Sequence, residues 1–182
     1  MSRLSQAIAE GDGISVLVEV ADGQAADAAE KQGADGLVAR RGSAGVRGAS
    51  QLPLLFVGAA GDALGAAADA LVIAPDAAAW EEARGLGLDC VVRVSDSDDL
   101  AQTLEELDPE LILLSADPES DEDNLEKLLA LLHDVPAGKL AIAELRDASA
   151  HDVAELERAG VDAVVVTSSD IAALVPAEPP EV

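Results

Sequence analysis

Eight short apolar runs recur along the chain, and they constrain the fold more than any other feature of the sequence. Continuous apolar segments of this length, without alternation, are typical of parallel strands that are buried on both faces. The chain therefore predicts a parallel sheet of eight strands. The runs are ISVLVEV (14–20), GLVAR (36–40), LPLLFVG (52–58), ALVIAP (70–75), CVVRVS (90–95), LILLSA (111–116), LAIAEL (140–145) and AVVVTS (163–168).

Four of these runs share a similar entry phrase: GADGLVA (33–39), AADALVIA (67–74), GLDCVVRV (87–94) and AGVDAVVV (159–166). A glycine in this position ends a helix in the left-handed conformation. The aspartate turns the chain into the strand and accepts hydrogen bonds from nearby backbone N–H groups. Each phrase therefore marks the passage from a helix into a buried strand.

Helical patterns occupy residues 22–34, 76–87, 97–108, 120–135 and 147–160, with Ser97 or Asp98 as a candidate cap for the third. Strands that alternate with helices predict a parallel sheet. Eight units favour a closed (β/α)8 TIM barrel over an open doubly wound sheet, which usually needs five or six strands. Residues 1–182 are expected to form this single domain, with a flexible acidic, proline-rich tail at about 176–182.

The predicted barrel is compact, because two connections in its first half are short. RGSAGVRGASQ (41–51) is too short and too rich in glycine for a full helix, and AAGDALGAAAD (59–69) is expected to form one or two weak turns at best. A typical barrel of this type takes about 250 residues, against 182 here. Shortened or missing helices are therefore expected between the second and fourth strands.

The charge of the chain excludes two classes of partner. It contains 36 acidic and 11 basic residues, for a formal net charge of −25. This field repels nucleic-acid phosphates and anionic membranes, so neither is expected to bind. The composition, with only three lysines, fits a protein from a high-salt cytoplasm and fits equally an acidic surface that keeps the protein soluble.

No metal site or cofactor is predicted. Cys90 is the only cysteine, and His133 and His151 cannot form a zinc site by themselves. The sequence has no signal-peptide layout and no apolar segment long enough to span a membrane, so we expect a soluble cytoplasmic protein.

The segments LGLDCVVRVSDSDDLAQTLE (86–105), VPAGKLAIAE (135–144) and AGVDAVVVTSSDI (159–171) resemble indole-3-glycerol phosphate synthase, a phosphate-binding barrel enzyme. The resemblance extends from about Ile14 to Leu174. It implies an active site at the carboxyl ends of the strands. Glu19 and Glu144 match carboxylates of the family pattern. Its other positions hold Ala21 and Val57 for lysines, Arg93 for a glutamate, and Ser115 or a neighbour for an asparagine.

The loss of both lysines predicts that the parent reaction is absent. Ring closure and dehydration need a proton donor at the reacting oxygens, and a positioned acid contributes about 10²- to 10⁴-fold. The remaining lysines lie in predicted helices, or, for Lys139, before the seventh strand at the opposite end of the barrel. A Schiff-base aldolase is excluded for the same reason.

Two candidate sites follow from the resemblance. Glu19 and Glu144 would be an acid and a base if they face one another, or part of a structural ion network with Arg93 and Arg146. Ser168, Ser169 and Arg146 would hold a phosphate with loop amides after the eighth strand, although the serines are equally those of a capped turn. Other polar residues expected at this end include Arg40, Arg41 and Ser115.

The sequence thus supports two functional hypotheses. The first is a degenerate barrel that binds a phosphorylated small molecule or inorganic anion without catalysis, as a binding or assembly protein with a possible protein partner or second copy. The alternative is a lyase or isomerase that acts on a small phosphorylated metabolite, with Glu19 and Glu144 as acid and base. An open mouth with unpaired carboxylates favours the enzyme, and salt-bridged residues that fill the mouth favour the binding protein.

Overall fold

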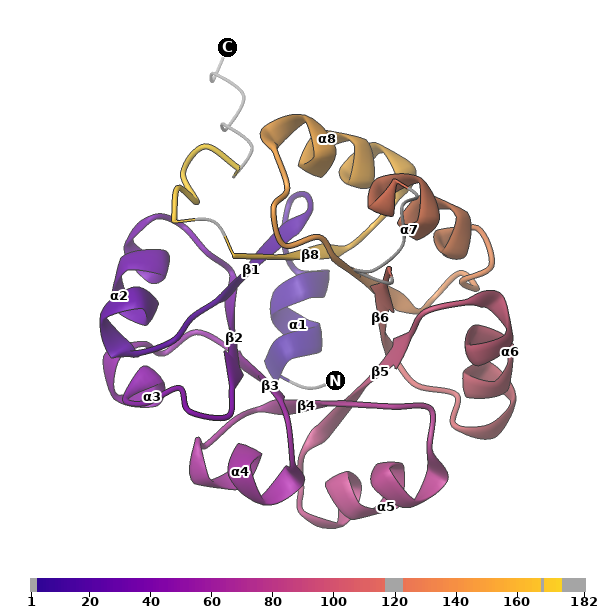
Figure 1. The fold of residues 1–182 in the computed structure, drawn as a ribbon, viewed down its shortest axis with the longest axis horizontal. Coiled ribbons are helices and arrows are strands. Elements are labelled where there is room, and N and C mark those ends of the chain that lie inside the picture. The colour runs from indigo at the N-terminus through magenta and orange to yellow at the C-terminus, as the bar shows by residue number, and fades with distance from the viewer. Residues whose placement is uncertain (1–2, 117–122, 168, 175–182) are drawn as a thin grey trace.

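The computed structural model describes residues 3–116, 123–167 and 169–174, and its eight parallel strands close into one barrel (Figure 1). The strands are β1 (Ser15–Glu19), β2 (Gly36–Arg40), β3 (Leu54–Val57), β4 (Ala70–Ile73), β5 (Asp89–Val94), β6 (Leu111–Ser115), β7 (Leu140–Glu144) and β8 (Ala163–Val166). Each pairs with the next, and β8 pairs with β1 to close the ring. The predicted (β/α)8 fold is confirmed. The expected tail at 176–182 lies outside the described residues.

Helices follow β1 to β7 and form the outer ring in Figure 1. They are α2 (Gly23–Lys31), α3 (Val46–Ala49), α4 (Ala60–Gly65), α5 (Ala77–Gly85), α6 (Ser97–Glu106), α7 (Asn124–Leu132) and α8 (Ala150–Ala159). The short connections are confirmed, since α3 and α4 have 4 and 6 residues. After β8 the described chain forms a turn as far as Leu174, so no helix fills the sector between α8 and α2 in that part of the chain.

The helix ends follow the sequence signals, with one correction. Gly160 ends α8 in the left-handed conformation, with a φ of 97°. The cap of α6 is Asp96, whose side chain accepts from the Asp99 amide at 2.8 Å. The predicted caps Ser97 and Asp98 are wrong, because Ser97 is already the first helical residue and only Asp96 has the extended backbone of a cap.

Three aspartates of the entry phrases join β2, β4 and β8 to the strand that precedes each of them. The carboxylates of Asp35, Asp69 and Asp162 each accept a hydrogen bond of 2.8 Å from the first part of the preceding strand, at the amides of Val16, Leu54 and Ala141. We call these three residues the aspartate latches. Burial raises the pKa of Asp35, and the Val16 hydrogen bond opposes that rise in part.

Helix α3 is short, and the Arg47 side chain on it forms hydrogen bonds with the backbone of the neighbouring connections. The guanidinium group donates to the carbonyls of Ala67 and Leu52 at 3.1 and 3.0 Å and pairs with Asp69 at 2.6 Å. Ala67 has a φ of 51°, which is uncommon for a residue other than glycine. The arginine thus satisfies backbone oxygens that the shortened connection leaves without partners.

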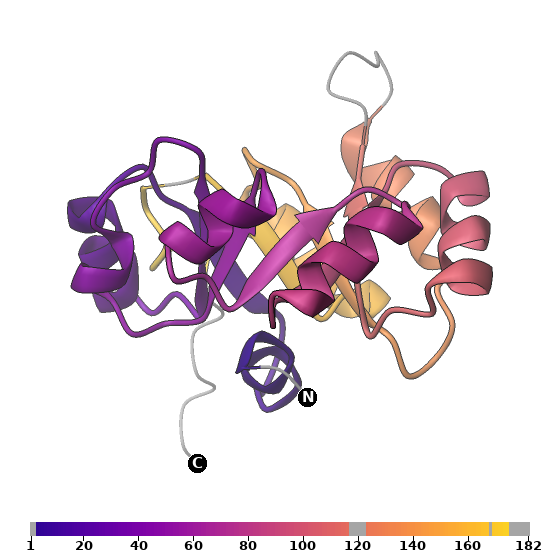
Figure 2. The same cartoon turned by 90° about the horizontal axis from the view of Figure 1, so that it is seen from below.

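An additional helix, α1 (Arg3–Ala9), closes the amino-terminal end of the barrel, and the sequence analysis did not identify it. Figure 2 shows α1 below the ring of strands, on the side where the strands begin. Leu4 and Ile8 pack against the interior side chains of the barrel, among them Leu17, Leu55 and Ile142. The Arg3 guanidinium donates to the Gln51 carbonyl and lies 3.5 Å from Asp69. This end of the barrel is therefore a packed floor.

The core is mainly aliphatic, with Phe56 buried among the aliphatic side chains, and Cys90 belongs to it. Its side chain is buried beside α5, and the thiol lies 3.9 Å from the Trp80 carbonyl. Burial is the main cause that raises the pKa of this thiol to about 11, and the Asp89 charge adds to it while Arg84 opposes it.

The raised pKa of Cys90 predicts slow alkylation. At pH 8 a thiol with a pKa of about 11 is ~0.1% thiolate, against ~24% for an ordinary pKa near 8.5. Iodoacetamide should therefore label Cys90 more than about 100-fold more slowly in the folded protein than in urea, as followed by mass spectrometry. Equal rates in the two states would contradict the buried environment.

Candidate functional site

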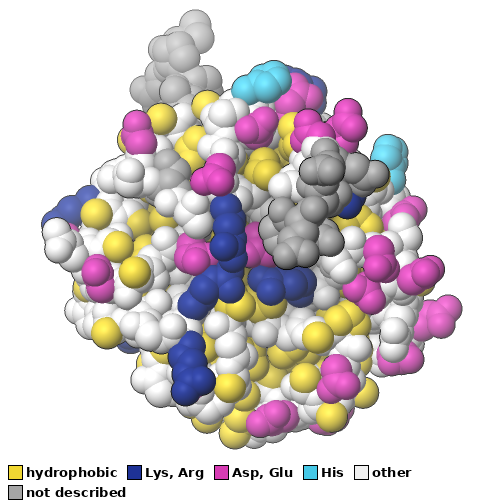
Figure 3. All heavy atoms as spheres, in the orientation of Figure 1, with side chains coloured by type: hydrophobic (Ala, Val, Ile, Leu, Met, Phe, Trp, Pro, Cys, Tyr) yellow, Lys and Arg dark blue, Asp and Glu magenta, His cyan; other side chains and the backbone are white. Residues whose placement is uncertain are grey.

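The polar end of the barrel is built by side chains at the carboxyl ends of five strands. Glu19, Arg40, Arg93, Ser115 and Glu144 each lie two residues beyond an interior aliphatic side chain of their own strand, so they point into the same lumen. We call this end the mouth. In Figure 3, Arg and Lys side chains gather over its centre, next to Asp and Glu side chains.

Glu144 is the centre of the mouth, because its two oxygens contact side chains from four strand ends. Oε1 accepts from Arg40 at 3.3 Å and lies 3.7 Å from Arg146, two residues after the end of β7. Oε2 accepts from Arg93 and from the Ser115 hydroxyl, each at 3.0 Å. The side chain is only 10% exposed. A buried carboxylate of this kind requires counter-charges, and three guanidinium groups provide them.

Glu19 joins the network through Arg40, whose Nε lies 2.9 Å from Glu19 Oε1. Burial alone would lower the pKa of Arg40, but the hydrogen bond and charge of Glu19, then those of Glu144, outweigh it and raise the pKa above its ordinary value. Arg40 therefore stays charged and connects the two carboxylates. Sequence reasoning expected Arg40 at this end but assigned Arg93 and Arg146 as the partners of both glutamates, which is wrong for Glu19.

A cavity of about 450 Å³ opens at the mouth beside this network. It is lined by Arg93, Ser115, Ala116, Asn124, Glu144, Leu145, Arg146 and Asp147. Arg146 is half exposed and Arg93 is one-third exposed. A guanidinium group has five N–H donors, and the bonds to Glu144 use only some of them. The cavity thus presents cationic donors to a ligand, and the carboxylate of Glu144 holds those donors in place.

The predicted phosphate site is described only in part, because Ser168 lies outside the described residues. Arg146 lines the mouth cavity, and its carbonyl accepts from both the amide and the hydroxyl of Thr167, each at 2.9 Å. These bonds tie the loop after β7 to the loop after β8. Ser169 is exposed in that second loop. Arg146 is therefore placed at the mouth, while the roles of Ser168 and Ser169 stay predictions.

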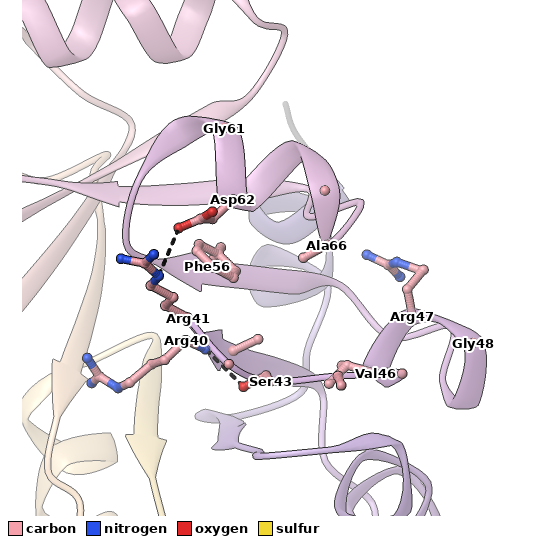
Figure 4. Close-up of a pocket in the computed structure, with 15 residues that line it drawn as sticks. Arg40, Arg41, Ser43, Val46, Arg47, Gly48, Phe56, Gly61, Asp62 and Ala66 are labelled. Carbon is pink, nitrogen blue, oxygen red and sulfur yellow. Dashed lines mark hydrogen bonds and ion pairs between the residues drawn. The ribbon is translucent and has the colours of Figure 1, made fainter.

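A second open pocket, of about 510 Å³, lies at the outer wall between α3 and α4 (Figure 4). Phe56 points toward it, Arg41 and Asp62 lie at one end 3.9 Å apart, and Arg47 lies at the other. Glycines 42, 45, 48, 61 and 65 line much of the remainder. The short helices α3 and α4 cover this side of the barrel incompletely and leave the pocket open. Two of its arginines pair with aspartates of the protein, Arg41 with Asp62 and Arg47 with Asp69.

The described residues contain no group of three or more histidine, cysteine, aspartate or glutamate side chains arranged for a metal ion. Among the helices of the described segments, none is long and apolar enough to cross a membrane. The three lysines lie in α2, in α7 and just before β7, where Lys139 pairs with Asp108 at 2.6 Å. The mouth cavity is therefore lined by arginines without a lysine.

Comparisons with solved structures define the class of protein, a (β/α)8 barrel. The N-acetylmannosamine-6-phosphate 2-epimerase from Clostridium perfringens matches with a TM-score of 0.68 and 14% identity, over 85% of this chain and 86% of the other. The thiamine phosphate pyrophosphorylase from Pyrococcus furiosus matches with a TM-score of 0.65 and 16% identity, over 88% and 90%. At these identities the likeness shows the fold alone. No protein-family model and no curated protein matches the chain.

Proposed function

We propose that this protein binds a small phosphorylated metabolite or inorganic anion at the mouth of the barrel, and that it has no indole-3-glycerol phosphate synthase activity. The observation that carries the proposal is the arrangement of Arg40, Arg93 and Arg146 around Glu144. In a chain with a net charge of −25, three of eight arginines contact this one carboxylate, and two of them, Arg93 and Arg146, line the cavity beside it. Arginine forks match the geometry of phosphate oxygens.

The same network argues against acid–base chemistry by the two glutamates. Both Glu144 oxygens already accept hydrogen bonds from charged or hydroxyl donors. Glu19 is paired with Arg40 and is not among the side chains that line the mouth cavity. A general base needs an oxygen within reach of the substrate proton. These contacts therefore favour a binding protein over an acid–base enzyme. We propose that this protein acts in the cytoplasm, either by itself, with a protein partner or as a homo-oligomer.

The alternative is a lyase or isomerase of a small phosphorylated metabolite. Two observations favour it: Glu144 does line the cavity, and both similar barrels are named for phosphorylated compounds. Glu19 and Glu144 would then be the acid and base only if ligand binding drew Arg40 away from them. Incorporation of deuterium from deuterium oxide into the carbon skeleton of a bound phosphorylated sugar would support this hypothesis. Binding without incorporation would support simple binding.

The phosphate site predicts a loss of binding when Arg146 is removed. Inorganic phosphate should bind the folded protein measurably by calorimetry, and Arg146→Ala should weaken that binding by about tenfold or more. Hydrogen bonds to charged groups are worth about 1.5–3 kcal/mol, which corresponds to this range. The amide signals of Thr167, Ser168, Ser169 and Asp170 should shift on titration, because their loop adjoins the site.

The matched control is Arg158→Ala, which removes an arginine of α8 that pairs with Glu155 on the outer surface. This variant should bind phosphate like the original chain. If it loses binding to the same degree as Arg146→Ala, the effect is one of overall charge, and the mouth site is wrong. If saturating phosphate leaves the loop signals unmoved in the folded protein, the proposed phosphate site at Arg146 does not function.

A further inference from the structure

The Arg93 side chain borders a second cavity at the mouth, different in character from the first. This cavity has a volume of about 290 Å³, and its lining includes Val57, Val72, Ile73 and Pro75 together with Arg93. We call it the apolar lobe, and we call the 450 Å³ cavity around Glu144 and Arg146 the anion lobe. Arg93 lines both, so one guanidinium group separates an apolar surface from a cationic one.

The apolar lobe results from a change of side-chain type around the ring of strand ends. β1, β2, β5, β6 and β7 end in charged or hydroxyl side chains that point into the lumen, whereas β3 and β4 present Val57 and Val72. These two valines are direct neighbours in the β3–β4 register. In Figure 3 hydrophobic side chains accordingly lie beside the arginines, toward β4 and β5.

Some polar groups of the apolar lobe have partners of their own, although the buried Arg93 Nε atom has no hydrogen-bond partner among the described residues. The Ser95 hydroxyl donates to the Asp99 carboxylate at 3.1 Å. The Arg93 Nη2 atom donates to Glu144 at 3.0 Å. The rest of the lining is aliphatic and consists of Val57, Val72, Ile73, Ala74 and Pro75. The volume of the lobe is about twice that of an apolar cavity of ~150 Å³ that accommodates a benzene molecule.

We propose that the ligand of this mouth is a phosphate monoester with a short apolar substituent. The inference rests on the proposed anion site: the phosphate binds in the anion lobe at Arg93 and Arg146, and the carbon substituent lies against Val57, Val72 and Pro75. Val57 and Val72 are then specificity-determining residues. They select ligands by burying carbon, while the arginines bind any phosphate.

The two lobes predict different dependences on ligand structure. Each methylene group that is removed from water strengthens binding by about fourfold. n-Butyl phosphate should therefore bind at least about tenfold more tightly than inorganic phosphate at pH 8, where both are largely dianions. Val57→Thr keeps the shape of the side chain and replaces one methyl group of the wall with a hydroxyl group. It should reduce this ratio to below about threefold and leave the dissociation constant of inorganic phosphate unchanged.

The experiment measures both dissociation constants by calorimetry in the original chain, in Val57→Thr and in Val135→Thr. Val135 is a half-buried valine between α7 and β7, so its variant controls for the substitution itself and should keep the tenfold ratio. Ala74→Gln is the second test variant, because Ala74 lines the lobe but is exposed and tolerates change without unfolding. Its longer side chain should fill the lobe and also abolish the ratio.

Each result separates the two proposals. If inorganic phosphate binds but n-butyl phosphate binds no more tightly, the apolar lobe is not a ligand site and the anion site stands. If the ratio persists in both Val57→Thr and Ala74→Gln, the substituent lies elsewhere and the assignment of the lobe is overturned. If neither compound binds the folded protein, the proposed function and this inference both fail.

Discussion

Glu144→Gln is expected to lower the free energy of unfolding by about 3 kcal/mol, the lower end of the range for breaking a buried ion pair. The substitution removes the charge that compensates three guanidinium groups, and its amide group places donors opposite donors. The lower end applies because Arg40 and Arg93 are each about one-third exposed, so water relieves part of the repulsion. Urea unfolding curves of the two proteins measure the difference.

Phosphate gives this prediction a second readout. An anion bound among the uncompensated arginines should stabilise Glu144→Gln more than it stabilises the original chain, because binding to the folded state alone adds to stability. The control is Glu155→Gln in the exposed pair with Arg158, where the expected loss is below about 1 kcal/mol. A loss for Glu144→Gln as small as that of the control would mean that the mouth is fully solvated.

Leu4→Ala should cost about 3 kcal/mol, within the range of about 2–5 kcal/mol for a leucine truncated in a packed core. Leu4 has no exposed surface, and it is held between α1 and the interior of the barrel. The truncation would leave a cavity in the floor that α1 cannot fill, because Arg3 anchors this helix to Asp69 and Gln51.

Leu64→Ala is the matched control, since Leu64 on α4 is 46% exposed and its truncation should change stability by less than about 0.5 kcal/mol. Thermal and urea unfolding of both variants provide the comparison. If Leu4→Ala behaves like Leu64→Ala, α1 does not pack as a structural floor in solution.

Much of the barrel could be predicted because its strands follow a local rule. In a run such as AVVV (163–166) the residues on both faces are apolar. This pattern can be recognised without knowing which segments the strand will contact. Boundaries and caps depend on geometry that the pattern lacks. In the segment from Asp96 to Asp99 several residues are good caps, and only the backbone conformation selects Asp96. Helix α1 was missed because Leu4 and Ile8 alone are too few apolar residues to predict a helix. They are stabilising only when a barrel interior is present for them to pack against.

The residues of the mouth could be predicted, but the partners within it could not. The position of Glu144 at a strand end places it at the mouth, and the sequence analysis located it there. Its pairing with Arg40 joins positions 104 residues apart, and β7 and β2 are not neighbours in the barrel. Arginine is long enough to cross the lumen, so the choice between Arg40, Arg93 and Arg146 depends on the three-dimensional arrangement of all the strand ends.

The aspartate latches separate the end of the barrel that stabilises the fold from the end that carries the mouth. They join β1 to β2, β3 to β4 and β7 to β8, always at the floor end, so three strand pairs are held there by a side chain as well as by their backbones. None of these contacts involves a side chain at the opposite rim. The loops at that rim can therefore be exchanged or lengthened while the aspartate latches stay intact. This makes a chain of 182 residues a small scaffold onto which new binding sites can be grafted.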